Sequence, residues 1–103
     1  MSRNARFGAE RERQVKKLLE AKGWMVTKAG GSLGVADLVA LRAGAPPELI
    51  QVKSDKDSPY THFGPAAREE LKRVADEAGA VAQLAWWPPR KPCRWIPSGQ
   101  WPS

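Results

Sequence analysis

Cysteine is almost absent from this sequence, since Cys93 is the only one among 103 residues. A single thiol cannot form a disulfide within the chain or build a thiolate-rich zinc site, so a disulfide-stapled secreted module and a zinc finger are excluded. We expect Cys93 to be a small apolar filler. The sequence also lacks an apolar run near the ~20 residues that a membrane span needs, and no signal-peptide pattern opens it. We therefore expect no membrane segment.

Acidic residues are outnumbered, because 17 Lys and Arg stand against 11 Asp and Glu, a formal charge of +6. Such a balance favours an anionic partner, either nucleic acid or an acidic membrane face, although many basic proteins simply stay soluble this way. Hydrophobic residues make up 42% of the chain, which is enough for a core. The length suits one domain spanning residues 1–103.

Helix formers, β-branched runs and turn residues alternate along the chain. They predict helices at 7–22 and 65–78, and strands at 24–28, 37–42, 48–53 and 81–87. The segment 1–6 is expected to be a flexible basic arm. Residues 88–103 form a tail rich in proline and tryptophan, in which 93–96 is a candidate edge strand. The order α-β-β-β-α-β predicts a single compact α/β domain with a mixed central sheet flanked by helices.

The expected hairpin brings an acid and an amine together. Side chains alternate between the faces of a strand, so a turn centred near Ala45 pairs Asp37 with Lys53 and places Gln51 on the same face. Charged groups on a half-buried face are costly unless they serve one another or a ligand. One interpretation is a cross-strand Asp–Lys ion pair at a sheet edge, worth well under ~1 kcal/mol if exposed.

The other interpretation of the hairpin is a divalent-metal site. Its ligands would be the Asp37 carboxylate, the Gln51 amide oxygen and the Val52 backbone carbonyl. Lys53 would hold a nucleophilic water or offset a developing phosphate charge.

The first helix offers a second carboxylate. At about 100° per residue, Val15, Leu18 and Leu19 form its apolar stripe, and Glu12 lies roughly 65° from the centre of that stripe. Glu12 therefore borders the buried face. It either pairs with Lys16 one turn along the helix, which is a common surface arrangement, or belongs to the metal site.

The order of these residues resembles a known family. An acidic residue on a first helix, a Gly/Ser loop, an Asp opening a strand and a Gln-x-Lys on the next strand occur in ERQVKKLLEAKGW, GGSLGVADLVAL and IQVKS. This set resembles the PD-(D/E)XK nuclease superfamily and, more narrowly, the archaeal-type (Hjc-like) Holliday junction resolvases, which also occur in phages. The resemblance runs from about Phe7 to Gly79 and implies a restriction-endonuclease-like fold.

The resemblance implies roles for individual residues. The family's helix glutamate, loop serine, metal-binding aspartate and lysine correspond to Glu12, Ser32, Asp37 and Lys53. The sequence departs from the family at Gln51, where these resolvases usually have glutamate, and at Ala36, which replaces the proline that names the superfamily. Because glutamine carries no charge, it should weaken binding of a hard cation and raise the importance of Glu12. The predicted catalytic set is Glu12, Ser32, Asp37, Gln51 and Lys53, and the predicted metal ligands are Glu12, Asp37, Gln51 and Val52.

The implied reaction is Mg²⁺-dependent phosphodiester hydrolysis on four-way DNA junctions, with Mn²⁺ as a possible substitute. The metal would polarise the scissile phosphate and lower the pKa of the attacking water. Basic side chains bind phosphates without reading bases, which suits recognition of a branched shape. The expected DNA contacts are Arg3, Arg6, Arg13, Lys28, Ser32, Lys56 and Tyr60. Such an enzyme would work with DNA in the cytoplasm.

Tryptophans are concentrated near the C-terminal end. Trp86 and Trp87 point to opposite faces of their strand, so one is expected to meet the core and the other a partner subunit. Cutting a junction symmetrically requires two active sites, and the resemblance implies a homodimer. We expect Trp86, Trp87 and Trp95 at its interface. The alternative is stacking on single-stranded nucleic acid.

Two further functions stay open. Gln51 and the tryptophan-rich tail are compatible with a non-catalytic nucleic-acid-binding module of the same fold. A nuclease of the same superfamily that acts on another DNA structure, such as a flap or a linear end, would carry the same motifs.

Overall fold

Five strands form one mixed sheet in the computed structural model, which describes residues 3–29 and 35–102. Their order across the sheet is their order in the chain: β1 (Met25–Lys28), β2 (Leu38–Leu41), β3 (Glu48–Lys53), β4 (Val81–Trp86) and β5 (Arg94–Pro97). β3 and β4 run parallel, and the other neighbours run antiparallel. The predicted order of elements is confirmed, and the candidate edge strand is present as β5.

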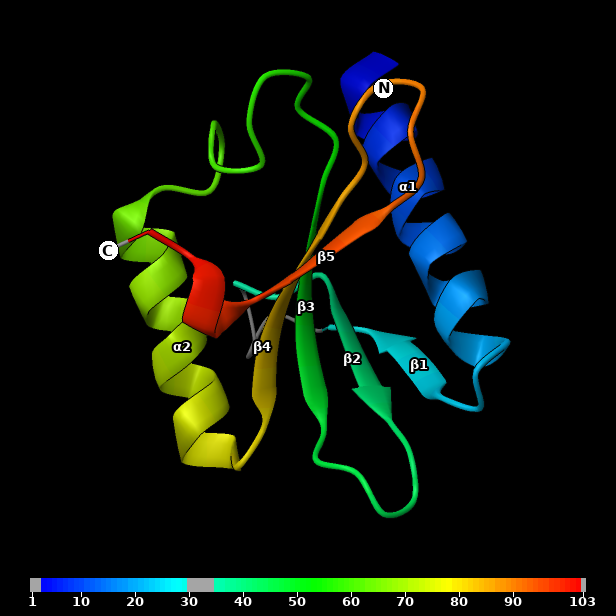
Figure 1. Cartoon of the computed structure of the whole chain (residues 1–103). Helices are drawn as coiled ribbons and strands as arrows, with labels where there is room; N and C mark the ends of the chain where they lie inside the picture. Colours follow the sequence, from blue (N-terminus) through cyan, green and yellow to red (C-terminus); the bar gives the residue numbers. More distant parts are fainter. Residues whose placement is uncertain (1–2, 30–34, 103) are drawn as a thin grey trace.

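Two helices cover the sheet, α1 (Arg3–Glu20) on one face and α2 (Pro65–Ala78) on the other (Figure 1). Side chains alternate between the two faces of each strand, so each helix packs against a separate core. On the α1 face, Val15 and Leu19 pack with Ile50 and other strand residues, and on the α2 face Leu71 packs with Leu49 and its neighbours. Each face of the sheet therefore packs against a helix of the same chain.

Helix α1 differs from its prediction at its start and in its buried face. It begins at Arg3, so residues 3–6, which we expected to form a flexible arm, are helical instead. Val15 and Leu19 are buried, but Leu18 is 41% exposed. The buried face is therefore rotated away from Leu18 and toward Glu12, whose side chain is 24% exposed.

Helix α2 has the bounds that its sequence predicts. Pro65 occupies the first turn, where the missing N–H is harmless. Gly79 ends the helix in the left-handed conformation at φ 65°, and its N–H donates to carbonyls of the last turn. The helix links the parallel strands β3 and β4, so it fixes the side-by-side alignment of their C-terminal ends.

The β2–β3 hairpin has a different register from the predicted one. Leu38 pairs with Ile50 and Val39 with Leu49, so Asp37, just before β2, lies nearer Gln51 than Lys53. The expected Asp37–Lys53 pairing is therefore wrong. Gly44 explains the shift, because its φ of 78° places the left-handed turn position one residue before Ala45.

The tail packs onto the sheet instead of leaving it. Strand β5 is followed by the short 3-10 helix η2 (Ser98–Gln100) and by Trp101, which is buried. The Trp101 indole N–H donates to the Ile96 carbonyl at 2.8 Å, and its ring meets Phe63 edge-on with centroids 5.1 Å apart. Across residues 3–29 and 35–102, neither helix has the length and apolar character to span a membrane.

Candidate nuclease site

Asp37 lies where β2 begins, and its backbone is tied to both neighbouring strands. Its N–H donates to the Ile50 carbonyl at 2.8 Å, and its own carbonyl accepts from the Ala29 N–H at 2.9 Å. The first bond is one residue out of step with the Leu38–Ile50 pairing, a bulge-like irregularity that can re-aim a side chain. The carboxylate turns toward β3, where Oδ2 accepts the Val52 N–H at 2.7 Å.

The Asp37 carboxylate is half-buried. Burial raises the pKa of its carboxyl group above the ordinary value, and this effect outweighs three opposing ones. The Val52 N–H and the positive charges of Lys53 and Lys28 each lower the pKa. Asp37 is therefore a carboxylate whose ionised form is under-solvated, which is the condition a bound cation relieves.

Glu12 on α1 lies within electrostatic reach of Asp37. Burial is the larger cause of its raised pKa, the negative charge of Asp37 raises the pKa further, and Lys28 lowers it. Within the described residues, the ion pair of Glu12 is with Lys28 on β1 at 4.0 Å, which does not support the alternative pairing with Lys16. Two carboxylates from distant parts of the chain thus repel each other near the start of β2.

A depression of about 240 Å³ opens at Glu12. Its lining includes three cationic side chains, and the full set is Ala9, Glu12, Arg13, Lys16, Lys28 and Leu38. Lys28 was predicted as a DNA contact, but the structure also makes it a neighbour of both carboxylates. Its pairing with Leu38 across β1 and β2 is the cause, because that register places it beside Asp37.

Strand β3 carries the remaining predicted site residues. Gln51, Val52 and Lys53 are all half-buried at its C-terminal end. Lys53 interacts electrostatically with Asp37, yet in the described part of the chain the two make no direct ion pair, so the simple cross-strand pair does not occur. The N–H and C=O of one strand residue point to the same side, so the Val52 carbonyl faces the same side as the N–H that Asp37 accepts.

The other predicted contacts have mixed surroundings. Ser32 lies outside the described residues, as do the side chains of Arg3 and Arg6. Arg13 forms an ion pair with Glu10, and Lys56 is exposed in the loop after β3. Tyr60 packs against the α2-face core with the Arg68 guanidinium 5.2 Å from its ring centroid, so it is part of the scaffold beside the site.

The predicted interface tryptophans are covered in part by their own chain. Trp86 packs on the α2-face core, and Trp87 and Trp95 pack on the α1-face core. The Arg11 guanidinium lies 4.7 Å from the Trp87 ring centroid. The opposite orientations of Trp86 and Trp87 were predicted correctly, but the two helices explain them, so orientation is no argument for a partner subunit.

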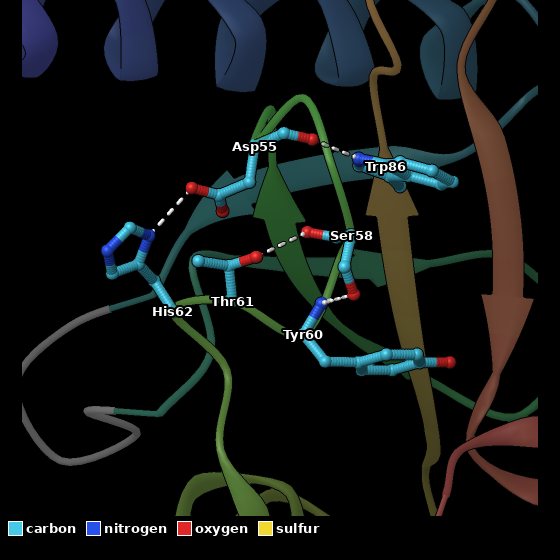
Figure 2. Close-up of polar contacts among 6 residues, drawn as sticks. All are labelled: Asp55, Ser58, Tyr60, Thr61, His62 and Trp86. Carbon is cyan, nitrogen blue, oxygen red and sulfur yellow. Dashed lines mark hydrogen bonds and ion pairs between the residues drawn. The ribbon is translucent and has the colours of Figure 1, made fainter.

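The loop after Lys53 is organised by contacts that the sequence did not reveal (Figure 2). Asp55 accepts from the His62 ring nitrogen Nδ1 at 2.6 Å, and its backbone carbonyl accepts the Trp86 indole N–H at 2.8 Å. Ser58 accepts from the Tyr60 N–H at 3.1 Å. These contacts fasten the loop to the end of β4 and so support the β3 end that carries Lys53.

The donors at this edge fit a hard divalent cation. Among the described residues, no three or more His, Cys, Asp and Glu side chains gather as a metal cage. The available donors are two carboxylates, an amide and a carbonyl, all oxygen. Mg²⁺ is commonly held by one or two carboxylates together with water and substrate phosphate, so a two-carboxylate site suits it.

Comparison with known proteins identifies the family and a similar solved structure. Residues 3–100 match the family model described as archaeal Holliday junction resolvase (hjc). The fold is similar to that of Hjc, a Holliday junction resolvase from the archaeal hyperthermophile Archaeoglobus fulgidus, with 26% sequence identity and a TM-score of 0.75. The match covers 89% of this chain and 73% of that chain. No curated protein matches the sequence.

Proposed function

This chain belongs to the archaeal Holliday junction resolvase family, and we propose that it is a metal-dependent endonuclease that cleaves four-way DNA junctions. The observation that carries the proposal is the closeness of two carboxylates, Glu12 and Asp37, with Lys28 acting on both and Lys53 acting on Asp37. Both carboxyl groups have raised pKa values, and each feels the charge of Lys28. Carboxylates, amines and a basic rim are the groups that phosphodiester hydrolysis needs.

Glu12 and Asp37 would hold the cation, with the Gln51 amide and the Val52 carbonyl as neutral donors. A bound Mg²⁺ or Mn²⁺ supplies Lewis acidity at the scissile phosphate and lowers the pKa of a water molecule. The Val52 N–H binds one oxygen of Asp37, so the other oxygen would be the one available to a cation. Burial disfavours both negative charges, and Asp37 raises the pKa of Glu12, so the two carboxylates would gain by sharing a cation.

Lys53 would orient the attacking water or offset the charge that develops on the phosphate. Its positive charge already acts on Asp37, so the ammonium group and the carboxylate share one site. Around them, Lys28 and Arg13 line the depression at Glu12, where they can bind the phosphates flanking the cut. Ser32, Lys56 and the arginines of the first helical turns are further proposed phosphate contacts.

The proposed substrate is branched double-stranded DNA, which places the enzyme with DNA inside the cell. Each chain carries one site, whereas resolution requires cuts in two strands. We therefore propose that a homodimer is the active form.

The test is cleavage of a labelled four-way junction by the purified protein with Mg²⁺ or Mn²⁺. Asp37→Asn should lower the cleavage rate at least about 10²-fold, and Lys53→Ala about 10²–10³-fold, while junction binding is kept. Lys17→Ala on the exposed side of α1 is the matched control for loss of one positive charge. An intact junction in both metals, or equal cutting by Asp37→Asn, would show that the enzymatic proposal is wrong.

Gln51 favours one competing function, a non-catalytic junction-binding module. That module would bind junctions with a steep salt dependence but never cut them. Mg²⁺ would have the same effect on junction affinity in the native protein and in Asp37→Asn. Measuring binding and cleavage on the same preparation separates the two functions.

A further inference from the structure

Three side chains form a row across the C-terminal part of the sheet, next to the proposed site. Lys53 on β3 is aligned with Trp86 on β4, and Trp86 is aligned with Arg94 on β5. Aligned residues on neighbouring strands lie on the same face. With a strand spacing near 4.8 Å, the backbones of Lys53 and Arg94 are about 10 Å apart, with the indole between them.

A groove of about 400 Å³ adjoins this row. Its walls come from the end of β4, the β4–β5 loop and the start of β5, and its lining is Trp86, Pro88, Lys91, Pro92, Cys93 and Arg94. Two of these side chains are cationic, and among the described residues that line the groove none is acidic. The volume is within the range of ligand-binding pockets.

The aromatic wall of this groove is held in place. The Trp86 indole N–H donates to the Asp55 carbonyl at 2.8 Å (Figure 2), and the ring packs against the α2-face core. Two prolines stiffen the loop above it. A ring fixed in this way is ready for stacking, because little side-chain freedom is lost when a ligand binds.

We propose that the groove binds one nucleotide of the junction strand, next to the scissile phosphate. The base stacks on Trp86, and the adjoining phosphate lies against Lys91 and Arg94. Aromatic rings that alternate with cations are the usual way in which proteins hold unpaired nucleotides. The strand would then cross the sheet from Lys53 to Arg94. This inference rests on the proposed function, because the cut at Lys53 sets which nucleotide is meant.

The positive charge of the groove favours a nucleotide over a second copy of this chain as its occupant. A second copy of this chain would have to place its own surface, with an overall charge of +6 per chain, against Lys91 and Arg94. A nucleotide instead offers a flat apolar base and an anionic phosphate to the same two kinds of group.

The test uses binding to four-way junctions in the uncleaving Asp37→Asn background. Trp86→Leu should weaken affinity about tenfold, and Trp86→Phe should restore most of it because stacking survives. Single abasic sites are then scanned through the nucleotides that flank the branch point. At one position the abasic site should weaken binding to the protein that keeps Trp86 about tenfold but leave binding to the Trp86→Leu variant almost unchanged.

Charge variants supply the matched control. Arg94→Gln should reduce affinity and flatten its salt dependence. Arg90→Gln removes the same charge from the loop before β5, outside the groove lining, and should change both less. Circular dichroism and thermal melting establish that each variant is folded. Sedimentation of each variant shows whether it keeps the oligomeric state of the parent.

Each outcome decides one proposal. If no abasic position couples to Trp86, the nucleotide groove is wrong. If Trp86→Leu also breaks up an oligomer, a second copy covers the groove. If an abasic position couples to Trp86 but the native protein does not cleave junctions, the nucleotide groove stands and the enzymatic proposal is wrong. If the native protein cleaves junctions but no abasic position couples to Trp86, the enzymatic proposal stands and the groove is wrong. If the Asp37→Asn protein does not bind junctions, both proposals are wrong.

Discussion

Asp37 is a residue that folding alone would not favour. Its carboxylate is half-buried, and one hydrogen bond from Val52 and two nearby lysines do not compensate for lost hydration, so its pKa is raised. A carboxyl group whose pKa is higher in the folded than in the unfolded state lowers stability at pH values above its folded pKa. Glu12 adds to this effect through like-charge repulsion. The two carboxylates therefore lower stability, and on the proposed function they would gain affinity for a cation in return.

The first prediction at the residue scale concerns stability and pH. Without divalent cations at pH 7, Asp37→Asn should raise Tm by roughly 2–5 °C, because the amide keeps an oxygen for Val52 and carries no charge. The gain should shrink as the pH falls through the folded pKa of Asp37 and vanish below its ordinary value, where both states are protonated. Thermal melts from pH 3 to pH 8 measure it. A variant less stable than the parent at pH 7 contradicts the proposed cost.

The second residue-scale prediction concerns Gln51. Gln51→Glu should lower the Mg²⁺ concentration needed for half-maximal cleavage by roughly tenfold, since a third negative ligand strengthens a hard-cation site. In metal-free buffer the same change should lower Tm through added repulsion. Gln100→Glu on η2 introduces the same charge at an exposed position and serves as the control. Unchanged Mg²⁺ dependence would show that residue 51 does not face the metal.

At the scale of elements, the β2–β3 hairpin sets the geometry of the site. Its turn passes through Gly44 at φ 78°, and the resulting register brings Asp37 to the Val52 N–H. Strand register changes in whole residues, so a slipped hairpin would place Asp37 against a different residue of β3. The loop that follows β3 adds the second constraint, because Asp55 fastens it to Trp86.

Gly44→Ala tests the hairpin. A side chain there meets no atom within 4 Å, so any effect comes from the left-handed backbone. We expect a loss of about 1 kcal/mol in unfolding free energy, together with a lower cleavage rate if the turn relaxes into another register. Gly99→Ala is the control, since it also meets open space but has no positive φ. Equal stability for both variants in denaturant titrations would contradict this account of the turn.

At the scale of the whole molecule, charge and symmetry determine how one small domain resolves a junction. A charge of +6 provides attraction to DNA without base contacts. On the proposed function, one site per chain would cut one strand, so a productive pair of cuts would need two copies. The opposite orientations of Trp86 and Trp87 do not by themselves indicate an interface, because each ring packs in part on a core of its own chain.

Mixed dimers test this requirement. A purified dimer of one native chain and one Asp37→Asn chain should nick a cruciform plasmid, whereas the native dimer should linearise it. Sedimentation at the concentration used for cleavage gives the oligomeric state directly. A native protein that sediments as a single chain and still linearises the plasmid would exclude the dimer.

The sequence alone was enough to predict the order of the elements and to name candidate site residues. Periodicity and turn chemistry gave α2 and β3 with their observed bounds, and the ordered motifs that contain Glu12, Asp37 and Lys53 carried the resemblance to a nuclease family, because local preferences and residue types depend on each residue in turn. Tertiary structure alone decided the hairpin register, the approach of Lys28 to both carboxylates and the alignment of Lys53 with Trp86 and Arg94. These three features depend on one glycine dihedral and on pairing between strands that are distant in the sequence. No local sequence pattern encodes contacts that form only when the strands pair.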